Sequence, residues 1–268
     1  MTALWWTESG PSDAPVVLLL HGGGTGAWMW RDQVPALRER YRVITPDLPG
    51  HDHSAGVPFG SPGEIVADLA GLLREVAPGP AGTLGAGAPG TVVIGFSFGA
   101  QLALALAAGH PDLVARAVVV SALAEPVALP GLSTGLSASL SAGLVRAAAP
   151  LGAQRWFARL QAKALYVDDT MFDDYLRTAR SLSAANLVAM TSANAAFRIP
   201  EAWARFPGQA LLLVGAAEPR ALVRGMRELH RRLPSSELEV VPGAGHGLPL
   251  QHTAWFTRRL SDWLDQQN

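Results

Sequence analysis

The stretch Val92-Val93-Ile94-Gly95-Phe96-Ser97-Phe98-Gly99-Ala100 decides the fold of this chain. Its β-branched start predicts a strand, and the Ala/Leu-rich run that follows, at about 99–108, predicts a helix. The pattern G-x-S-x-G at a strand–turn–helix junction is typical of a serine nucleophile held in a strained turn. The glycines two residues before and after Ser97 avoid a Cβ where strand and helix come close, and the helix start points N–H groups at a developing anion. We therefore expect Ser97 to be a nucleophile.

Length and composition limit the class of protein. A chain of 268 residues is most simply one α/β domain with an inserted segment. A formal net charge of −1 without a basic run argues against nucleic acid as a partner. The chain has no cysteine, which excludes disulfides, a thiol nucleophile and zinc–thiolate sites. A nucleophile in this chain therefore has to be something other than cysteine.

We expect neither a targeting segment nor a membrane segment. Residues Met1 to Gly10 lack the basic and apolar regions of a signal peptide. The longest strongly apolar strand-like run, Val16 to Leu20, is far shorter than the ~20 residues of a membrane-spanning helix. The sequence thus predicts a cytoplasmic protein without a membrane partner and leaves its oligomeric state open.

Strands and helices alternate along most of the chain. Strand-like runs lie at 16–20, 41–45, 92–94, 117–120, 210–214 and 238–241, with a candidate edge strand at 3–7. Helical patterns lie at about 29–40, 62–76, 99–108, 221–233 and 253–265. The stretch from Ala77 to Gly90 is almost entirely Ala, Gly and Pro, which predicts a flexible surface loop. This order predicts an α/β fold with a mostly parallel twisted sheet and helices on both faces.

The alternation stops between 126 and 200. This segment shows no strand pattern, and its aromatic residues recur at helix-compatible spacings among Arg and Asp. We expect a helical insertion that forms a lid over the C-terminal edge of the sheet, where ligands of such sheets bind. The predicted organisation is a core of residues 1–125 and 201–268 with a helical lid at 126–200.

One of the seven histidines is the candidate general base. His110 and His230 lie on or at the ends of helical segments and His252 begins the last one, so we expect surface or capping roles for them. His246 differs because it lies in a Gly-rich loop just after the last strand. In a parallel sheet this loop shares the C-terminal edge with Ser97, so His246 is placed to accept the serine proton.

The acid that orients this histidine has two candidates. Glu218 follows the strand that precedes the His246 strand, and Pro219 favours an extended backbone for it. The chain order Ser97, Glu218, His246 is a known order of a serine–acid–histidine triad. The alternative is Glu125, which also follows a strand and precedes a proline. We favour Glu218.

A tetrahedral intermediate needs two N–H donors for its oxyanion. The residue after the nucleophile, Phe98, offers one, and the loop His21-Gly22-Gly23-Gly24 offers the other, with Gly23 the preferred donor. We expect His21 to shape this loop. Asp47, at another strand end, is expected to be structural.

With these residues in view, the chain resembles the α/β-hydrolase superfamily, in the lid-bearing group of serine esterases. The resemblance spans nearly the whole chain and rests on five motifs: His21-Gly22-Gly23-Gly24 with Trp28 and Trp30, Pro46-Asp47-Leu48-Pro49-Gly50-His51, the serine turn, Gly215-x-x-Glu218, and Gly243-x-Gly245-His246. The chain departs from the pattern in three ways: Glu218 stands where most relatives have Asp, Asp52 replaces the usual glycine before His53, and the sheet is shortened at its N-terminal edge. A serine nucleophile argues against the related dehalogenases and epoxide hydrolases, which use aspartate.

The expected activity is cleavage of a small carboxylic ester through an acyl-enzyme, without a metal or organic cofactor. The substrate is expected to be a largely apolar small molecule, in a pocket that includes Gly22, Trp28 and Phe96, with Phe98 as a further wall residue. Cleavage of a thioester, a lactone or a carbon–carbon bond would use the same residues. A lyase, a cyclase or a ligand receptor on the same scaffold is an alternative of another class, and turnover would separate a receptor from an enzyme.

Overall fold

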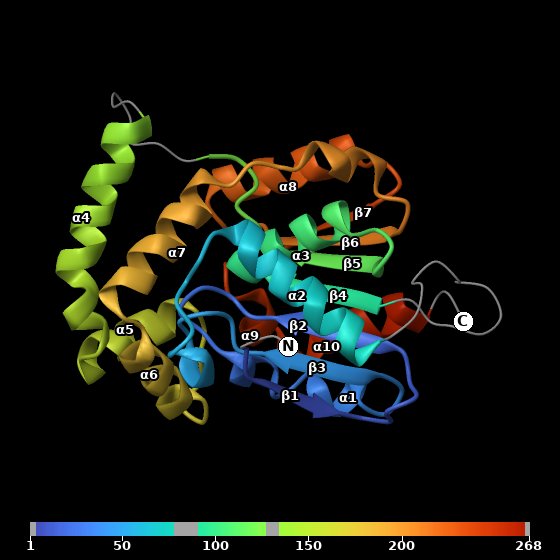
Figure 1. Cartoon of the computed structure of the whole chain (residues 1–268), viewed down its shortest axis with the longest axis horizontal. Helices are drawn as coiled ribbons and strands as arrows, with labels where there is room; N and C mark the ends of the chain where they lie inside the picture. Colours follow the sequence, from blue (N-terminus) through green and yellow to red (C-terminus); the bar gives the residue numbers. More distant parts are fainter. Residues whose placement is uncertain (1–3, 78–90, 127–133, 266–268) are drawn as a thin grey trace.

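A computed structural model of the chain describes residues 4–77, 91–126 and 134–265, with the side chains of 134–139 excepted. Its strands form one seven-stranded sheet in the order β1-β3-β2-β4-β5-β6-β7 (Figure 1). β1 runs antiparallel to β3, and every other neighbouring pair is parallel. The strands are β1 (Trp6–Ser9), β2 (Val16–Leu20), β3 (Arg42–Pro46), β4 (Thr91–Phe96), β5 (Val114–Val120), β6 (Gln209–Gly215) and β7 (Glu237–Val241). The predicted α/β fold is confirmed. The flexible loop expected before β4 lies, from residue 78 on, outside the described residues.

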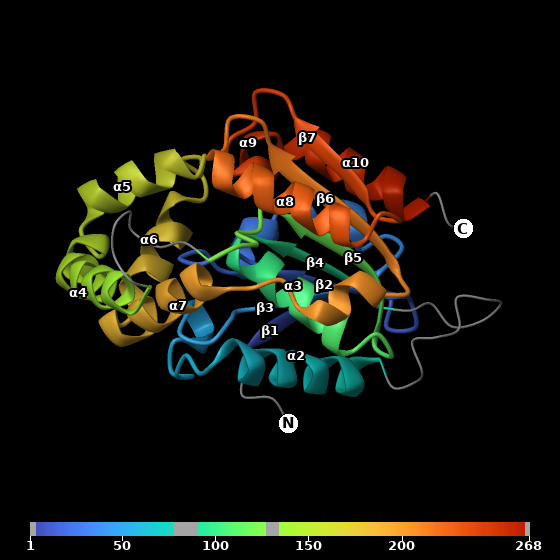
Figure 2. The ribbon, with the colours of Figure 1, turned by 90° about the horizontal axis from the view of Figure 1, so that it is seen from above.

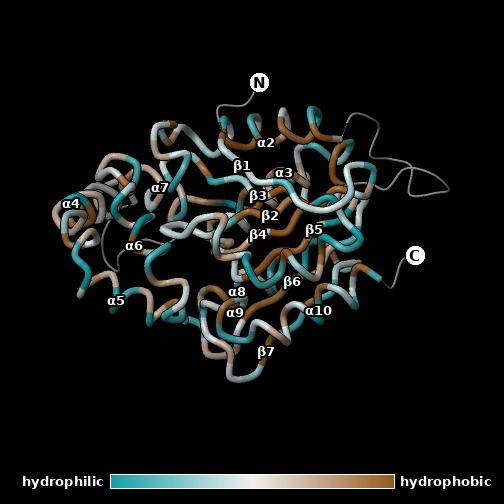
Figure 3. The backbone as a smooth tube through the Cα atoms, turned by 90° about the horizontal axis from the view of Figure 1, so that it is seen from below, coloured by the Kyte–Doolittle hydropathy of each residue, from teal (hydrophilic) through white to brown (hydrophobic). Residues whose placement is uncertain are grey.

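Both faces of the sheet are covered because its central strands are apolar on both sides. Leu18 and Val93 join the hydrophobic cluster with α2 (Pro62–Val76), α3 (Phe98–Gly109) and α8 (Arg220–Arg232). Their neighbours in sequence, such as Leu19 and Ile94, join the opposite cluster with α1 (Val34–Leu37) and α10 (Thr253–Asp265). In Figure 1, α2 and α3 lie in front of the sheet and α10 behind it. Figure 3 shows the central strands as the hydrophobic centre of the molecule.

The start of α2 shows how local sequence sets an element. Ser61 Oγ accepts a hydrogen bond from the Glu64 N–H at 3.2 Å, and the Glu64 carboxylate accepts one from the Ser61 N–H at 2.7 Å. This reciprocal capping satisfies two N–H groups that the first helical turn leaves free. Pro62 occupies the first helical position, where no N–H is needed.

The prediction of one continuous helix at 29–40 is wrong. The chain instead forms a short 3₁₀ helix, η1 (Ala27–Trp30), then a turn, and then the single helical turn α1 (Val34–Leu37). Pro35 has no N–H to donate to the carbonyl of Arg31, so the two segments cannot join into one helix. The buried side chains of Trp30 and Leu37 still pack on the same face of the sheet.

Four α-helices and a short 3₁₀ helix, η3 (Glu201–Arg205), separate β5 from β6 in the described part of the chain; the α-helices are α4 (Thr134–Gly152), α5 (Arg155–Ala164), α6 (Phe172–Ser181) and α7 (Ala184–Ala196). We refer to residues 134–196 as the helical insertion. Figure 2 shows its helices gathered beyond one end of the strands. Side chains of the insertion reach the loops that follow β2: Met190 lies against Gly23, and Thr178 accepts a hydrogen bond from Trp28 Nε1 at 2.9 Å. No helix in the described ranges combines the length and apolarity needed to cross a bilayer.

Two buried histidines join the loop after β2 to the loop after β3. His21 Nε2 accepts the Leu48 N–H at 2.9 Å, and His51 Nε2 accepts the Gly24 N–H at 3.1 Å. Because each Nε2 accepts, each proton lies on Nδ1, which faces a backbone carbonyl of its own loop. Burial lowers the pKa of His21 to about 4 and the pKa of His51 to about 3. Both rings are therefore neutral near pH 7, as these hydrogen bonds require.

The close approach of α3 to β2 makes a first prediction. A Cβ on Gly99 would overlap the carbonyl oxygens of Leu20 and His21, whereas a Cβ on Gly71, in the middle of α2, would meet nothing within 4 Å. We expect Gly99→Ala to lower the free energy of unfolding by about 1–3 kcal/mol through overpacking. The control Gly71→Ala should raise it by roughly 0.5–1 kcal/mol, because alanine loses less backbone entropy. Urea titrations of both variants check this, and equal effects would contradict it.

The two neutral histidines predict a loss of stability in mild acid. Their folded pKa values lie below the unfolded value of 6.5, so the unfolded chain binds more protons and stability falls as the pH drops below about 6.5. Between pH 7 and pH 5 each ring should cost roughly 2 kcal/mol. His51→Gln keeps an acceptor for Gly24 but does not titrate, so its loss between these pH values should be smaller by about that amount. Urea unfolding at pH 7, 6 and 5 measures the difference, and identical pH slopes for both proteins would refute it.

Candidate active site

Ser97 sits in a strained turn between β4 and α3. Its φ is 53° and its ψ −113°, a region that non-glycine residues rarely occupy. Its N–H donates to the Val120 carbonyl at 2.8 Å, which fixes the turn to the neighbouring strand β5. A Cβ on Gly95 would overlap the Gly99 carbonyl oxygen, so this strand and helix can meet only through glycine. The turn therefore places the Ser97 hydroxyl at the C-terminal edge of the sheet.

Three side chains form a hydrogen-bonded chain at this edge. The Ser97 Oγ lies 3.0 Å from His246 Nε2, and His246 Nδ1 lies 2.7 Å from the Glu218 carboxylate. The ionised carboxylate can only accept, so Nδ1 carries the proton and Nε2 is free to accept from the serine. The Glu218 side chain is fully buried, whereas that of His246 is 32% exposed. The histidine thus has a shielded partner on one side and access to a ligand on the other.

Ser121, which the sequence analysis did not single out, completes the support of Glu218. Its hydroxyl donates to Glu218 Oε1 at 2.7 Å, and the Gly215 N–H donates to the same oxygen at 2.8 Å. Ser121 has a φ of 56° and its N–H is bound to the Leu213 carbonyl, so the end of β5 turns its side chain toward β6. The available signal was weak: a serine directly after a strand that neighbours the acid's strand. With both bonds, Oε1 is satisfied and Oε2 faces His246.

The alternative acid lies elsewhere. The Glu125 carboxylate binds Arg224 Nε at 3.0 Å, and its side chain is 40% exposed. This pair links the segment after β5 to α8 at the surface. Glu218, by contrast, is the carboxylate in contact with His246.

The two expected oxyanion donors lie close together. A Cβ on Gly23 would stand 3.7 Å from the Phe98 Cβ. Within the described ranges, no hydrogen bond uses the backbone N–H of Gly23 or of Phe98. The neighbouring donor Gly24, in contrast, is bound to His51. Two free N–H groups beside the serine turn suit an anion that forms on a substrate bound to Ser97.

A cavity of about 440 Å³ opens between this glycine loop and the helical insertion. Gly23 and Gly24 form its floor, and its described walls come from α4 to α7 with no charged side chain among them: Val145, Ala148, Ala149, Gly152, Phe157, Gln161, Ala164, Leu165, Tyr175, Ala179, Leu182, Leu187, Met190 and Thr191. Its volume falls in the range of small-molecule sites. An apolar cavity that begins at the expected oxyanion loop is suited to the hydrocarbon part of a ligand.

None of the three residues expected to line the pocket, Gly22, Trp28 and Phe96, is among the described residues that line this cavity. Phe96 is buried with its ring 5.2 Å from the His246 ring, and Gly22 lies against Phe96. Trp28 packs edge-on against Tyr175, a wall residue of the cavity, and lines a second cavity of about 330 Å³. Phe98 packs against Phe59. Of these aromatic residues, Phe96 contacts the His246 ring and Trp28 contacts a wall residue of the cavity.

Asp52, the departure at the usual glycine position, connects the core to the insertion. It has a φ of 40°, and its carboxylate accepts both Arg177 Nε at 2.8 Å and Arg177 Nη2 at 2.7 Å. Burial opposes its ionisation, but the Arg177 hydrogen bonds hold the pKa of Asp52 below its usual value. Its N–H donates to Ser181 Oγ at 3.0 Å. The residue therefore holds α6 against the loop after β3.

Asp47, Asp52 and His53 also place three potential metal-ligand atoms within 4.8 Å of one another. Their contacts explain the cluster without an ion: Asp47 accepts the N–H groups of Ala27 and His53 and contacts the His53 ring, while Arg177 binds Asp52. The expected structural role of Asp47 agrees with this bonding. Both carboxylates already have hydrogen-bond donors from the protein.

Comparison with known proteins agrees with this architecture. The family model described as "Alpha/beta hydrolase family" matches residues 17–259. A pimeloyl-[acyl-carrier protein] methyl ester esterase of Neisseria meningitidis serogroup B is 29% identical over 266 residues, which is 96% of both chains. An esterase of Mycobacterium tuberculosis is 40% identical over 122 residues, 45% of this chain and 36% of that protein. A magnesium-chelatase 30 kDa subunit of Rhodobacter capsulatus is 40% identical over 121 residues, 44% of this chain and 38% of that one. The last two similarities thus span little more than a third of each relative.

Solved structures show the same fold. An esterase from Thermogutta terrifontis superposes with a TM-score of 0.71 at 22% identity, over 98% of this chain and 93% of that one. The enol-lactonase from Burkholderia xenovorans superposes with a TM-score of 0.74 at 22% identity, over 97% and 96%. With a family match that spans 17–259 and a sheet, serine turn and connections of this design, the chain belongs to the alpha/beta hydrolase family.

Proposed function

We propose that this protein is a serine hydrolase that cleaves a small carboxylic ester through an acyl-enzyme. The observation that carries the proposal is the chain of contacts from Ser97 Oγ to His246 Nε2, at 3.0 Å, and from His246 Nδ1 to Glu218, at 2.7 Å. A serine hydroxyl needs such a base, and the base needs such an acid, to become an effective nucleophile. The relatives whose names include "esterase" support an ester as the substrate class.

The reaction then follows from the positions of these groups. Ser97 Oγ attacks the ester carbonyl carbon while His246 Nε2 takes its proton, and the carbonyl oxygen becomes an oxyanion bound by the N–H groups of Gly23 and Phe98. His246 returns the proton to the leaving alcohol as the carbon–oxygen bond breaks, which leaves an acyl-Ser97 ester. Water, deprotonated by His246, repeats the attack and releases the acid. Glu218 stays ionised throughout and stabilises the imidazolium.

The cavity under the helical insertion supports the proposed choice of substrate. Its described walls carry no charged side chain, so an uncharged and largely apolar acyl group is favoured there. The floor at Gly23 places the acyl carbonyl next to a proposed oxyanion donor. In this proposal the insertion acts as the lid expected at 126–200, and it encloses the acyl group while the alcohol faces the exposed side of His246.

The nucleophile can be tested without knowledge of the natural substrate. A fluorophosphonate reacts with an activated serine, so the wild type should gain the mass of a single adduct, while Ser97→Ala and His246→Ala should gain none. Intact-mass spectrometry measures the adduct, and circular dichroism of each variant controls for folding. An adduct that persists in Ser97→Ala would contradict the assignment of the nucleophile, and an unlabelled wild type would contradict an activated serine.

The identity of the acid is tested by a matched pair of amide substitutions. Glu218→Gln keeps the size of the side chain but removes the charge that fixes the His246 tautomer, so kcat for a 4-nitrophenyl ester should fall by up to ~10⁴-fold. Glu125→Gln breaks a surface pair with Arg224 and should leave kcat within about twofold, since exposed ion pairs contribute little. If Glu125→Gln were the variant that lost activity, the proposed triad would be wrong.

A further inference from the structure

The tip of the helical insertion presses on the loop that carries His246. Where α5 ends, the Leu165 carbonyl oxygen and the Tyr166 ring occupy the space that a Cβ on Gly247 would need. On the other side of His246, a Cβ on Gly245 would stand 2.5 Å from Tyr166 Oη and 3.0 Å from Tyr166 Cε2. The two glycines that flank the histidine are thus in close contact with the insertion.

Tyr166 is held in this place by an unusual backbone conformation. Its φ is 60°, in the left-handed region that aromatic residues rarely adopt. The Tyr166 N–H donates to the Lys163 carbonyl at 3.1 Å, and the Val167 N–H donates to the Ala162 carbonyl at 2.9 Å, so the last turn of α5 wraps into this conformation. Strained conformations persist where the surroundings determine them, and they cluster at functional sites.

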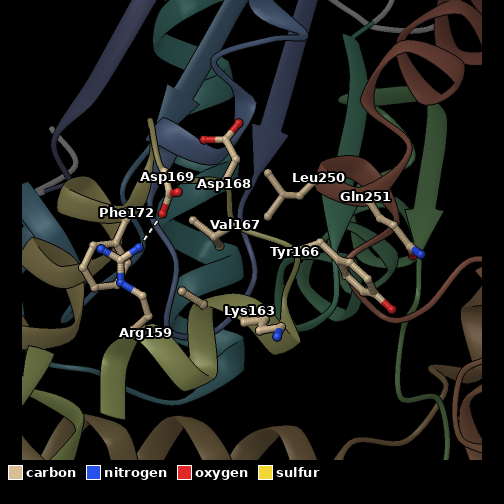
Figure 4. Close-up of a pocket in the computed structure, with 10 residues that line it drawn as sticks. Arg159, Lys163, Tyr166, Val167, Asp168, Asp169, Phe172, Leu250 and Gln251 are labelled. Carbon is tan, nitrogen blue, oxygen red and sulfur yellow. Dashed lines mark hydrogen bonds and ion pairs between the residues drawn. The ribbon is translucent and has the colours of Figure 1, made fainter. Parts of the chain in front are cut away.

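A second residue, Gln251, forms hydrogen bonds with the loop that carries His246. Gln251 Oε1 accepts the Gly245 N–H at 2.6 Å, and Gln251 Nε2 donates to the Gly243 carbonyl at 3.4 Å. Figure 4 shows Tyr166 and Gln251 together on one side of a cavity of about 550 Å³, with Arg159 and Phe172 on the other. Gly245 therefore contacts both the Gln251 amide from α9 (Leu248–Gln251) and the Tyr166 ring from the insertion, and this ring borders the cavity.

We propose that Tyr166 is a positioning residue that couples the helical insertion to His246. While the Tyr166 ring contacts Gly245, the loop that carries His246 cannot move away from Ser97, and His246 Nε2 stays within hydrogen-bond distance of Ser97 Oγ. The cavity beside the ring gives Tyr166 room to leave, so displacement of the insertion would release the histidine loop. This inference rests on the proposed function, because it assigns Tyr166 a role only if His246 is the general base. Small displacements of a catalytic group cost large factors in rate, up to ~100-fold for about 1 Å.

The test is a double-mutant cycle between Tyr166 and Gly245. The three protein atoms nearest to a Cβ on Gly245 all belong to Tyr166, and the φ of Gly245 is not in the left-handed region. The shortest contacts of the new methyl group in Gly245→Ala are therefore with Tyr166, and we expect this variant to disturb the loop mainly through Tyr166. Tyr166→Asn removes the ring and keeps a residue that tolerates a positive φ. We expect each single variant to be slowed ~10–100-fold, and Gly245→Ala to cost less than about twofold when Tyr166→Asn is already present.

Three further variants control the cycle. In Gly247→Ala the new Cβ would collide with the Leu165 backbone oxygen, a contact that Tyr166→Asn leaves in place. The rate lost in Gly247→Ala should therefore not be restored by Tyr166→Asn. Tyr166→Phe keeps the aromatic ring, so it should retain most of the wild-type rate that Tyr166→Asn loses. Trp156→Asn removes an aromatic residue of α5 that is 65% exposed, and it should leave the rate unchanged.

The readouts separate positioning from mere stability. The second-order rate of fluorophosphonate labelling of Ser97, and kcat for 4-nitrophenyl acetate, should fall together, while KM for this short ester changes less than about twofold. Thermal unfolding shows whether a variant is only destabilised. A labelled wild type with unchanged rates in Tyr166→Asn, or additive effects in the cycle, would overturn the inference. An unlabelled wild type would overturn the proposed function instead.

Discussion

The arrangement of this protein depends on the contact between the end of β4 and the start of α3. The backbone at Gly95 lies against the backbone at Gly99, and Ser97, midway between these glycines, has a φ of 53°. Such a conformation is unfavourable alone, and the surrounding structure maintains it: the Ser97 N–H is bound to β5, and Gly99 packs on the carbonyl oxygens at the end of β2. Three central strands are thus locked together at the point where the serine emerges.

The rest of the site follows from the order of strands outward from β4. Because β5, β6 and β7 lie side by side and parallel, their C-terminal ends deliver Ser121, Glu218 and His246 in sequence along one edge. A buried carboxylate is costly unless its oxygens are hydrogen-bonded. Here Oε1 receives two donors and Oε2 faces the imidazole, so both oxygens of the buried Glu218 carboxylate have hydrogen-bond partners within the protein. The neutral pair His21 and His51 fixes the opposite side, where the glycine loop approaches Ser97.

Sequence alone could place much of this architecture because it depends on chain order. Alternating apolar runs and helical patterns predicted the parallel sheet, and loops after three strands pointed to Ser97, Glu218 and His246. Ser121 and Tyr166 could not be found in this way, since their contacts are with segments distant in sequence, Ser121 with Glu218 and Tyr166 with Gly245. The broken helix at 27–37 is a different kind of failure, because Pro35 is visible in the sequence and cannot supply the N–H that one continuous helix would need. The contacts of the insertion also depend on side chains that no local pattern reveals, Met190 on Gly23 being one.

The bidentate pair between Asp52 and Arg177 has a consequence for the proposed role of the insertion as a lid. Any conformation in which α6 moves away from the core has to separate this pair and hydrate the buried carboxylate, while Arg31 loses Asp174 at the same surface. The closed arrangement is thereby favoured electrostatically rather than by apolar burial alone. Dissolved ions weaken attraction between exposed charges. If the insertion acts as the proposed lid, the solvent-accessible Arg31–Asp174 pair makes access to Ser97 depend on ionic strength, whereas the buried Asp52 carboxylate is much less sensitive to added salt.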